Sequence, residues 1–129
     1  MKPSRPRAVL FDAYGTLFDV YSVALVAEQL YPGRGEALAA LWRDKQIEYT
    51  RLVTMAAPDG GLYRSFWELT RAALRYACAR LGLALTRDRE DRLMNQYRHL
   101  SAFPENREVL AALKARGLVT GILSNGDPA

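Results

Sequence analysis

The fold class follows from one segment near the start of the chain, Ala8-Val9-Leu10-Phe11-Asp12-Ala13-Tyr14-Gly15-Thr16-Leu17-Phe18-Asp19. Its first four residues form a continuous apolar run, which is typical of a strand buried on both faces in a parallel α/β sheet. Asp12 follows this run directly, and Gly15 breaks it. Reactive groups in open α/β sheets lie beyond the carboxyl ends of the strands, so Asp12 is a candidate nucleophile. The alternative is that Asp12 and Thr16 only cap turns.

A second predicted strand ends in the same way. Residues 118–123 are mostly apolar, and Ser124, Asn125 and Gly126 follow them. If the two strands are neighbours in a parallel sheet, their ends bring together a carboxylate, a hydroxyl and an amide. By itself, Ser124-Asn125-Gly126 is also a common turn. It indicates a functional site only because it follows a predicted buried strand.

Most of the chain between these two strands is predicted to be helical. Apolar residues recur at helical spacing in residues 20–30, 36–55 and 63–81. Thr86 is a candidate N-cap for a helix over residues 86–100, and Pro104 and Gly117 are start and stop signals for a helix over residues 104–116. Residues 18–100 are too long for a loop and carry their own apolar stripes, which indicates a helical insertion. The predicted order is therefore a strand, a helical insertion, and a helix and strand that return to the first strand.

Composition narrows the possible functions. The chain has 18 basic and 14 acidic residues, for a net charge of +4, but the basic residues are scattered along helices, so no nucleic-acid partner is expected. His99 and Cys78 are the only residues of their types, which leaves no ligand set for a His/Cys metal site. The single cysteine favours a reducing compartment, and no segment is typical of a signal peptide or a membrane span. We therefore expect a cytoplasmic protein.

Four segments resemble the L-2-haloacid dehalogenases of the haloacid dehalogenase superfamily. They are Phe11 to Asp19, Ala40 to Arg43, Lys45 to Tyr49, and Leu123 to Gly126. The resemblance runs over nearly the whole chain. It implies an α/β fold in which residues 1–17 and 101–129 form a partial Rossmann-like core with a parallel sheet. Residues 18–100 would form an inserted helical cap domain, and the C-terminal part of the core would be absent.

The residue two positions after Asp12 argues against phosphatase chemistry. Most members of the superfamily are magnesium-dependent phosphohydrolases with a second Asp at that position, whereas this chain has Tyr14. A phenol with a pKa near ~10 poorly replaces a carboxylic acid and is a poor ligand for a hard cation. Substitution at carbon fits better, because a halide leaves as a stable anion without a proton. A phosphatase-like hydrolase with an altered acid is the alternative.

The resemblance implies hydrolytic dehalogenation of L-2-haloalkanoic acids to D-2-hydroxy acids, with a small-molecule 2-haloacid as the substrate. Asp12 would attack C2 and form an ester, and water would then hydrolyse that ester. Thr16 would orient Asp12, while Ser124 and the backbone of Asn125 would hold the substrate carboxylate. No metal and no other cofactor are expected.

The resemblance also implies a halide site and a pocket wall. Arg43 and the Asn125 side chain would receive the departing halide, and Tyr14, Ile47 and Phe66 would line the pocket and exclude water. Simpler interpretations exist for the helical residues. Arg43 could be an ordinary surface residue, and Ile47 and Phe66 could be core residues of the cap.

The sequence stops soon after the second motif. The family also needs a lysine that pairs with the nucleophile and a later group that positions water, and both would lie beyond residue 129. We therefore expect a fragment that is inactive alone; a truncated gene product, half of a complex and a non-catalytic interaction module are alternatives. Two core strands do not make a stable sheet, so we expect a homodimer or association through the exposed core edge.

Overall fold

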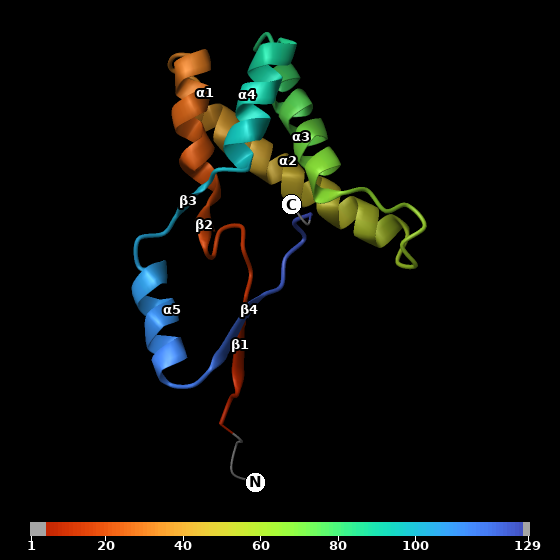
Figure 1. Cartoon of the computed structure of the whole chain (residues 1–129). Coiled ribbons are helices and arrows are strands. Elements are labelled where there is room, and N and C mark those ends of the chain that lie inside the picture. The colour runs from red at the N-terminus through yellow and green to blue at the C-terminus, as the bar shows by residue number, and fades with distance from the viewer. Residues whose placement is uncertain (1–4, 128–129) are drawn as a thin grey trace. The chain divides into compact units, whose positions relative to one another are not determined.

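The computed structural model describes residues 5–127, which form a mixed α/β structure in two compact units (Figure 1). The first unit combines the residues up to Asp19 with Ser101–Asn125. Within the described residues, the second unit consists of Val20–Leu100, Gly126 and Asp127.

The first unit is centred on a pair of parallel strands. Strand β1 (Ala8–Phe11) pairs with β4 (Val119–Ile122), and the register runs from Ala8 opposite Val119 to Phe11 opposite Ile122. Helix α5 (Asn106–Ala115) precedes β4 and ends at Gly117, whose φ of 73° is left-handed. The prediction of two parallel strands connected through a helix is confirmed, and the carboxyl ends of both strands lie at the same edge.

A second pair of strands was not predicted. Strand β2 (Phe18–Asp19) pairs antiparallel with β3 (Ser101–Ala102). The N–H of Phe103 also donates to the carbonyl of Leu17 at 3.1 Å, which extends the pairing by one step. Strands of two residues carry no periodic pattern, so sequence reasoning had no signal for them. Strand β2 immediately precedes residues 20–100 and β3 immediately follows them, so their pairing joins the two ends of the helical segment.

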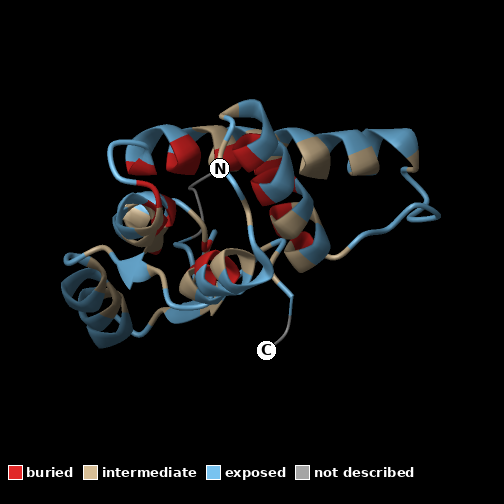
Figure 2. Cartoon of the chain, turned by 90° about the horizontal axis from the view of Figure 1, so that it is seen from above, coloured by how far each residue is buried: buried red, intermediate tan, exposed pale blue. Residues whose placement is uncertain are grey.

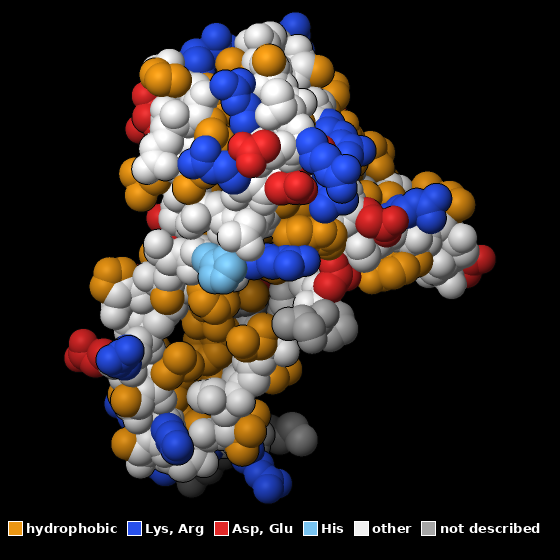
Figure 3. Space-filling view, turned by 45° about the horizontal axis from the view of Figure 1, so that its top comes forward, with side chains coloured by type: hydrophobic (Ala, Val, Ile, Leu, Met, Phe, Trp, Pro, Cys, Tyr) orange, Lys and Arg blue, Asp and Glu red, His pale blue; other side chains and the backbone are white. Residues whose placement is uncertain are grey.

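The prediction that β1 is buried on both faces is wrong. Leu10 is 66% exposed, and Ile122 on β4 is 60% exposed. Helix α5 contributes no buried residue, and Figure 2 shows it without any buried colour. Two strands and one helix offer too little surface to enclose the apolar side chains of a parallel pair. Apolar side chains therefore stay on the surface of this unit (Figure 3).

The second unit is all helical. A 3₁₀ turn (Val20–Val23) leads into α1 (Ala24–Leu30), and three longer helices follow: α2 (Gly35–Ala56), α3 (Phe66–Arg80) and α4 (Arg87–Tyr97). Its core contains large side chains that are at most 1% exposed, among them Leu38, Trp42, Leu74, Leu93 and Met94. Figure 2 shows this burial concentrated on the facing sides of the helices. Of the helices in residues 5–127, none combines the length and apolar character needed to cross a bilayer.

Side-chain caps set two of the helix starts. The helix predicted from Tyr63 begins at Phe66, because Ser65 and Glu68 form a reciprocal capping box. The Ser65 hydroxyl accepts from the Glu68 N–H at 3.1 Å, and the Glu68 carboxylate accepts from the Ser65 N–H at 3.0 Å. Thr86 caps α4 as predicted, by accepting from the N–H of Arg89 at 3.3 Å. These contacts satisfy N–H groups that the helices themselves leave unpaired.

The connection between α1 and α2 depends on a close approach at Gly35. The Glu28 carboxylate accepts hydrogen bonds from the N–H groups of Gly33 and Gly35, and these bonds hold the pKa of Glu28 below its ordinary value. Gly35 is buried, and a Cβ atom added there would lie 2.7 Å from both the Ala24 carbonyl oxygen and the Glu28 Cβ. Glycine is therefore required at this position by packing, independently of backbone dihedral angles.

Gly35→Ala is expected to lower the free energy of unfolding by about 1–3 kcal/mol, because the two helices must separate to admit one methyl group. Ala37→Ser, on an exposed position two residues later, is the control and should stay within about 0.5 kcal/mol of the parent chain. Urea unfolding followed by far-UV circular dichroism measures both. Equal effects of the two substitutions would contradict the close approach.

Candidate active site

Asp12 lies at the carboxyl end of β1 and is held by the turn that follows it. The N–H groups of Leu17 and Phe18 both donate to the carbonyl of Ala13 at 3.0 Å, which folds the chain back toward the strand. As a result, the Thr16 hydroxyl donates to Oδ2 of Asp12 at 3.3 Å. Both side chains are exposed. A hydroxyl that donates to one carboxylate oxygen restricts the rotation of the carboxyl group, as an oriented nucleophile requires.

The second strand end lies beside the first. The N–H of Leu123 donates to the carbonyl of Phe11 at 2.8 Å, so the parallel pairing continues up to the residue before Ser124. Ser124 and Asn125 therefore leave the sheet at the same edge as Asp12. Tyr14 lies in the turn after β1 and forms an isolated bridge with Phe18. The structure thus places at one edge of the first unit all five site residues that were predicted there.

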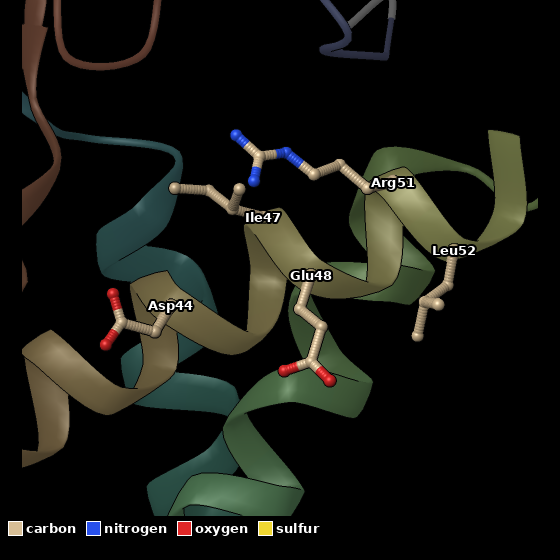
Figure 4. A pocket seen from close by; sticks show the side chains of 5 residues that line it. All are labelled: Asp44, Ile47, Glu48, Arg51 and Leu52. Atoms are coloured by element: carbon tan, nitrogen blue, oxygen red, sulfur yellow. The ribbon is translucent and has the colours of Figure 1, made fainter. Parts of the chain in front are cut away.

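The other three predicted site residues belong to the second unit. Arg43 and Ile47 lie one turn apart on α2, and Phe66 is the buried first residue of α3. A hollow of about 480 Å³ adjoins α2 and is lined by Asp44, Ile47, Glu48, Arg51 and Leu52. Figure 4 shows Ile47 and Arg51 projecting from the same side of the helix. Ile47 thus lines a hollow, whereas the burial of Phe66 also fits a core residue.

Sequence reasoning missed Gln46, which lies between Arg43 and the helical core. Gln46 is fully buried, and its amide oxygen accepts a hydrogen bond from Nη1 of Arg43 at 2.6 Å. A signal was present in the sequence. Gln46 continues the four-residue spacing of Leu38 and Trp42, so it falls on the apolar stripe of α2. A polar residue at such a position usually has buried partners.

Cys78 is a core residue of the second unit. It is 1% exposed, and burial raises the pKa of its thiol to about 11. A thiol in this state is a poor nucleophile near neutral pH. Among residues 5–127, no group of three or more His, Cys, Asp or Glu side chains is arranged to hold a metal ion.

Curated dehalogenases can be aligned with nearly all of this chain. An (S)-2-haloacid dehalogenase of Pseudomonas putida is 43% identical over 121 residues, which make up 94% of this chain and 52% of that protein. The haloacetate dehalogenase H-2 of Moraxella sp. (strain B) is 44% identical over 120 residues, 93% of this chain and 52% of that protein. The chain spans about half the length of the curated relatives it matches.

Solved structures agree with these matches. The L-2-haloacid dehalogenase RSc1362 is 62% identical, with a TM-score of 0.93 over 97% of this chain and 55% of that one. An L-2-haloacid dehalogenase from Xanthobacter autotrophicus with chloropropionic acid covalently bound is 42% identical, with a TM-score of 0.83 over 96% of this chain and 48% of that one. The family model of the haloacid dehalogenase-like hydrolases matches residues 6–129. The chain therefore belongs to the haloacid dehalogenase-like hydrolase family.

Proposed function

We propose that this chain supplies the nucleophile and part of the substrate pocket of a hydrolase that converts L-2-haloalkanoic acids to D-2-hydroxy acids. The observation that carries the proposal is the hydrogen bond from Thr16 to Asp12 at the end of β1, beside the end of β4. Relatives that share this half of their sequence are named (S)-2-haloacid dehalogenases, and one related structure holds chloropropionic acid covalently. A covalent adduct is what an attacking carboxylate would form.

The proposed reaction has two steps. In the first, a carboxylate oxygen of Asp12 attacks C2 of the substrate from the side opposite the halogen. The carbon–halogen bond breaks, the halide leaves with the bonding electrons, and an ester with inverted configuration is formed. In the second, water attacks the carbonyl carbon of the Asp12 ester, which releases the D-2-hydroxy acid and restores the carboxylate with one oxygen from water.

Residues of the first unit would bind and orient the substrate. Thr16 keeps the Asp12 carboxylate in position, which its hydrogen bond supports. The Ser124 hydroxyl and the backbone N–H of Asn125 would hold the substrate carboxylate, because both follow the end of the neighbouring strand. Tyr14 would form part of the pocket wall and exclude water during the first step.

Residues of the second unit would complete the site. The guanidinium of Arg43, with the Asn125 side chain, would receive the halide, since a fork of N–H donors suits a departing anion. Ile47 and Phe66 would close the apolar side of the pocket. We propose that residues 18–100, most of which belong to the second unit, form a helical cap domain, and that residues 1–17 and 101–129 form a partial Rossmann-like core. The buried helical core of the second unit supports this assignment.

Two further proposals concern assembly and location. The exposed apolar side chains of the parallel pair, Leu10, Val119 and Ile122, support association with a second copy of the chain through the core edge. The single cysteine, which is buried and free, is compatible with a reducing cytoplasmic compartment.

The activity is tested on two proteins: this chain alone and a chimera. The chimera joins this chain to the part of the RSc1362 dehalogenase that lies beyond the matched region. Halide release from L-2-chloropropionate is compared with release from the D-enantiomer and with hydrolysis of p-nitrophenyl phosphate in the presence of magnesium.

We expect the chimera to release halide from the L-enantiomer and to keep its rate when a chelator is added. Phosphate release that depends on magnesium would instead support the phosphatase-like alternative. No turnover of either substrate by the chimera would support a non-catalytic module. Comparing the halide-release rate of this chain alone with that of the chimera shows whether this chain has any activity without the added part.

A further inference from the structure

A buried polar network in the second unit connects α2, α3 and α4. At its centre, the side chain of Gln46 is fully buried and accepts two hydrogen bonds at Oε1, from Arg43 Nη1 at 2.6 Å and from the Tyr97 hydroxyl at 2.8 Å. Its amide nitrogen donates to Oγ1 of Thr70, also fully buried, at 2.6 Å. Both the oxygen and the nitrogen of this amide therefore have a hydrogen-bond partner, and a buried amide left without one would be costly.

The direction of each hydrogen bond in the network follows from its neighbours. The Thr70 hydroxyl donates its proton to the carbonyl of Phe66 at 2.7 Å, one turn earlier on α3, so it accepts from Gln46. The amide nitrogen of Gln46 must then face Thr70, and the amide oxygen must face Arg43. The guanidinium of Arg43 only donates, which agrees with this orientation. The carbonyl of Phe66 thus orients the Thr70 hydroxyl, and Thr70 orients the Gln46 amide. As a result, the amide oxygen of Gln46 is the acceptor for Arg43.

We propose that Gln46 is a positioning residue that fixes the guanidinium of Arg43 in the orientation needed to receive the halide. This inference rests on the function proposed for Arg43. Arginine has a long, flexible side chain, but its guanidinium is planar. Nη1 of Arg43 donates a short hydrogen bond to Gln46, which is itself held by Thr70 and Tyr97, and this bond therefore restricts the plane of the whole guanidinium.

The chemistry of an amide explains why glutamine suits this position. A carboxylate there would also accept from Arg43, but it would form an ion pair and cancel the charge that attracts a halide. The neutral amide of Gln46 holds the cation and leaves its positive charge uncompensated by this contact. An apolar residue of the same length would keep the packing but release Arg43.

The first test measures the orientation of Arg43 without any turnover. The Nη–H signals of Arg43 in this chain are assigned by NMR from their loss in Arg43→Lys, and their exchange with water is measured, because Nη1 donates to Gln46. Gln46→Met should raise this exchange rate about ten-fold or more, because a hydrogen bond to a charged group is lost. The same substitution at Gln96, whose amide makes only an exposed contact to the His99 carbonyl at 3.3 Å, should leave the rate unchanged.

The second test measures halogen dependence in the chimera. Gln46→Met should lower kcat for L-2-chloropropionate by about ten- to a hundred-fold. The loss should be smaller for L-2-bromopropionate, because bromide is the better leaving group and needs less assistance. The bromide-to-chloride ratio of kcat should therefore rise, as it should in Arg43→Lys. A purely structural role for Gln46 would lower both rates by the same factor and leave the ratio as it was.

Gln46→Glu covers the case in which Gln46→Met does not fold, since it keeps the size and one acceptor oxygen. It should weaken inhibition by added bromide about ten-fold, because the carboxylate neutralises Arg43. An unchanged exchange rate or an unchanged halogen ratio in Gln46→Met would overturn the proposal, as would unchanged bromide inhibition in Gln46→Glu. If the unsubstituted chimera releases no halide, the proposed function fails, while the exchange rate still decides whether Gln46 fixes Arg43.

Discussion

Asp12→Asn is expected to lower kcat for halide release by roughly 10⁴-fold or more, because a neutral amide cannot supply the attacking oxygen anion. The substitution conserves shape, and the amide oxygen of Asn can still accept the hydrogen bond that Thr16 gives to Oδ2. Asp12 is also exposed, so the change removes no buried contact. The loss should therefore be chemical, with the free energy of unfolding almost unchanged.

Halide release by the chimera measures this effect, and circular dichroism checks the fold. Asp59→Asn is the matched control, because Asp59 is an exposed loop residue that accepts from the Gly61 N–H at 3.0 Å. Its rate should stay within about two-fold of the parent rate. Near-normal turnover by Asp12→Asn would show that Asp12 is not the nucleophile.

Isotope labelling tests the same assignment in the unsubstituted chimera. In a single turnover in ¹⁸O-water, the product should carry no label, because its new oxygen comes from Asp12. The label should appear in Asp12, where water has attacked the ester carbonyl. Label in the first product molecule would indicate direct attack by water on C2.

Local sequence patterns were enough to predict the two strands whose ends carry Asp12 and Ser124. The apolar run before Asp12 and the second run before Ser124 gave both strands of the parallel pair and the edge at which their ends meet. Helix starts were predictable where a cap was visible, as at Thr86. At α3 the capping box of Ser65 and Glu68 sets the start at Phe66, three residues after the predicted start.

Properties that depend on distant parts of the chain were not predictable in this way. The exposure of Leu10 is set by what covers the sheet, which an apolar run does not reveal. The pairing of β2 with β3 joins two-residue strands about eighty residues apart, and no local pattern encodes it. The role of Gln46 depends on partners from α3 and α4, so its position on an apolar stripe was only a hint. Catalytic roles of the eight site residues stay predictions.

Trp42 is the largest fully buried side chain among residues 5–127. Its side chain is 1% exposed, and its indole N–H donates to the carbonyl of Thr70 at 2.8 Å, which connects α2 to α3. Its ring lies 5.2 Å from that of Tyr97 on α4, at an interplanar angle of 51°. Trp42, on α2, therefore contacts both α3 and α4.

Trp42→Ala is expected to lower the free energy of unfolding by about 3–5 kcal/mol, since it leaves a cavity and removes a buried donor. Small domains have only about 5–15 kcal/mol of stability, so this loss would leave the second unit close to unfolding. Trp67→Ala is the matched control, because Trp67 is partly exposed and its ring mainly meets the Arg98 guanidinium at 4.4 Å. The control should cost about 1 kcal/mol. Urea unfolding followed by far-UV circular dichroism compares the two, and equal losses would mean that Trp42 does not hold the three helices together.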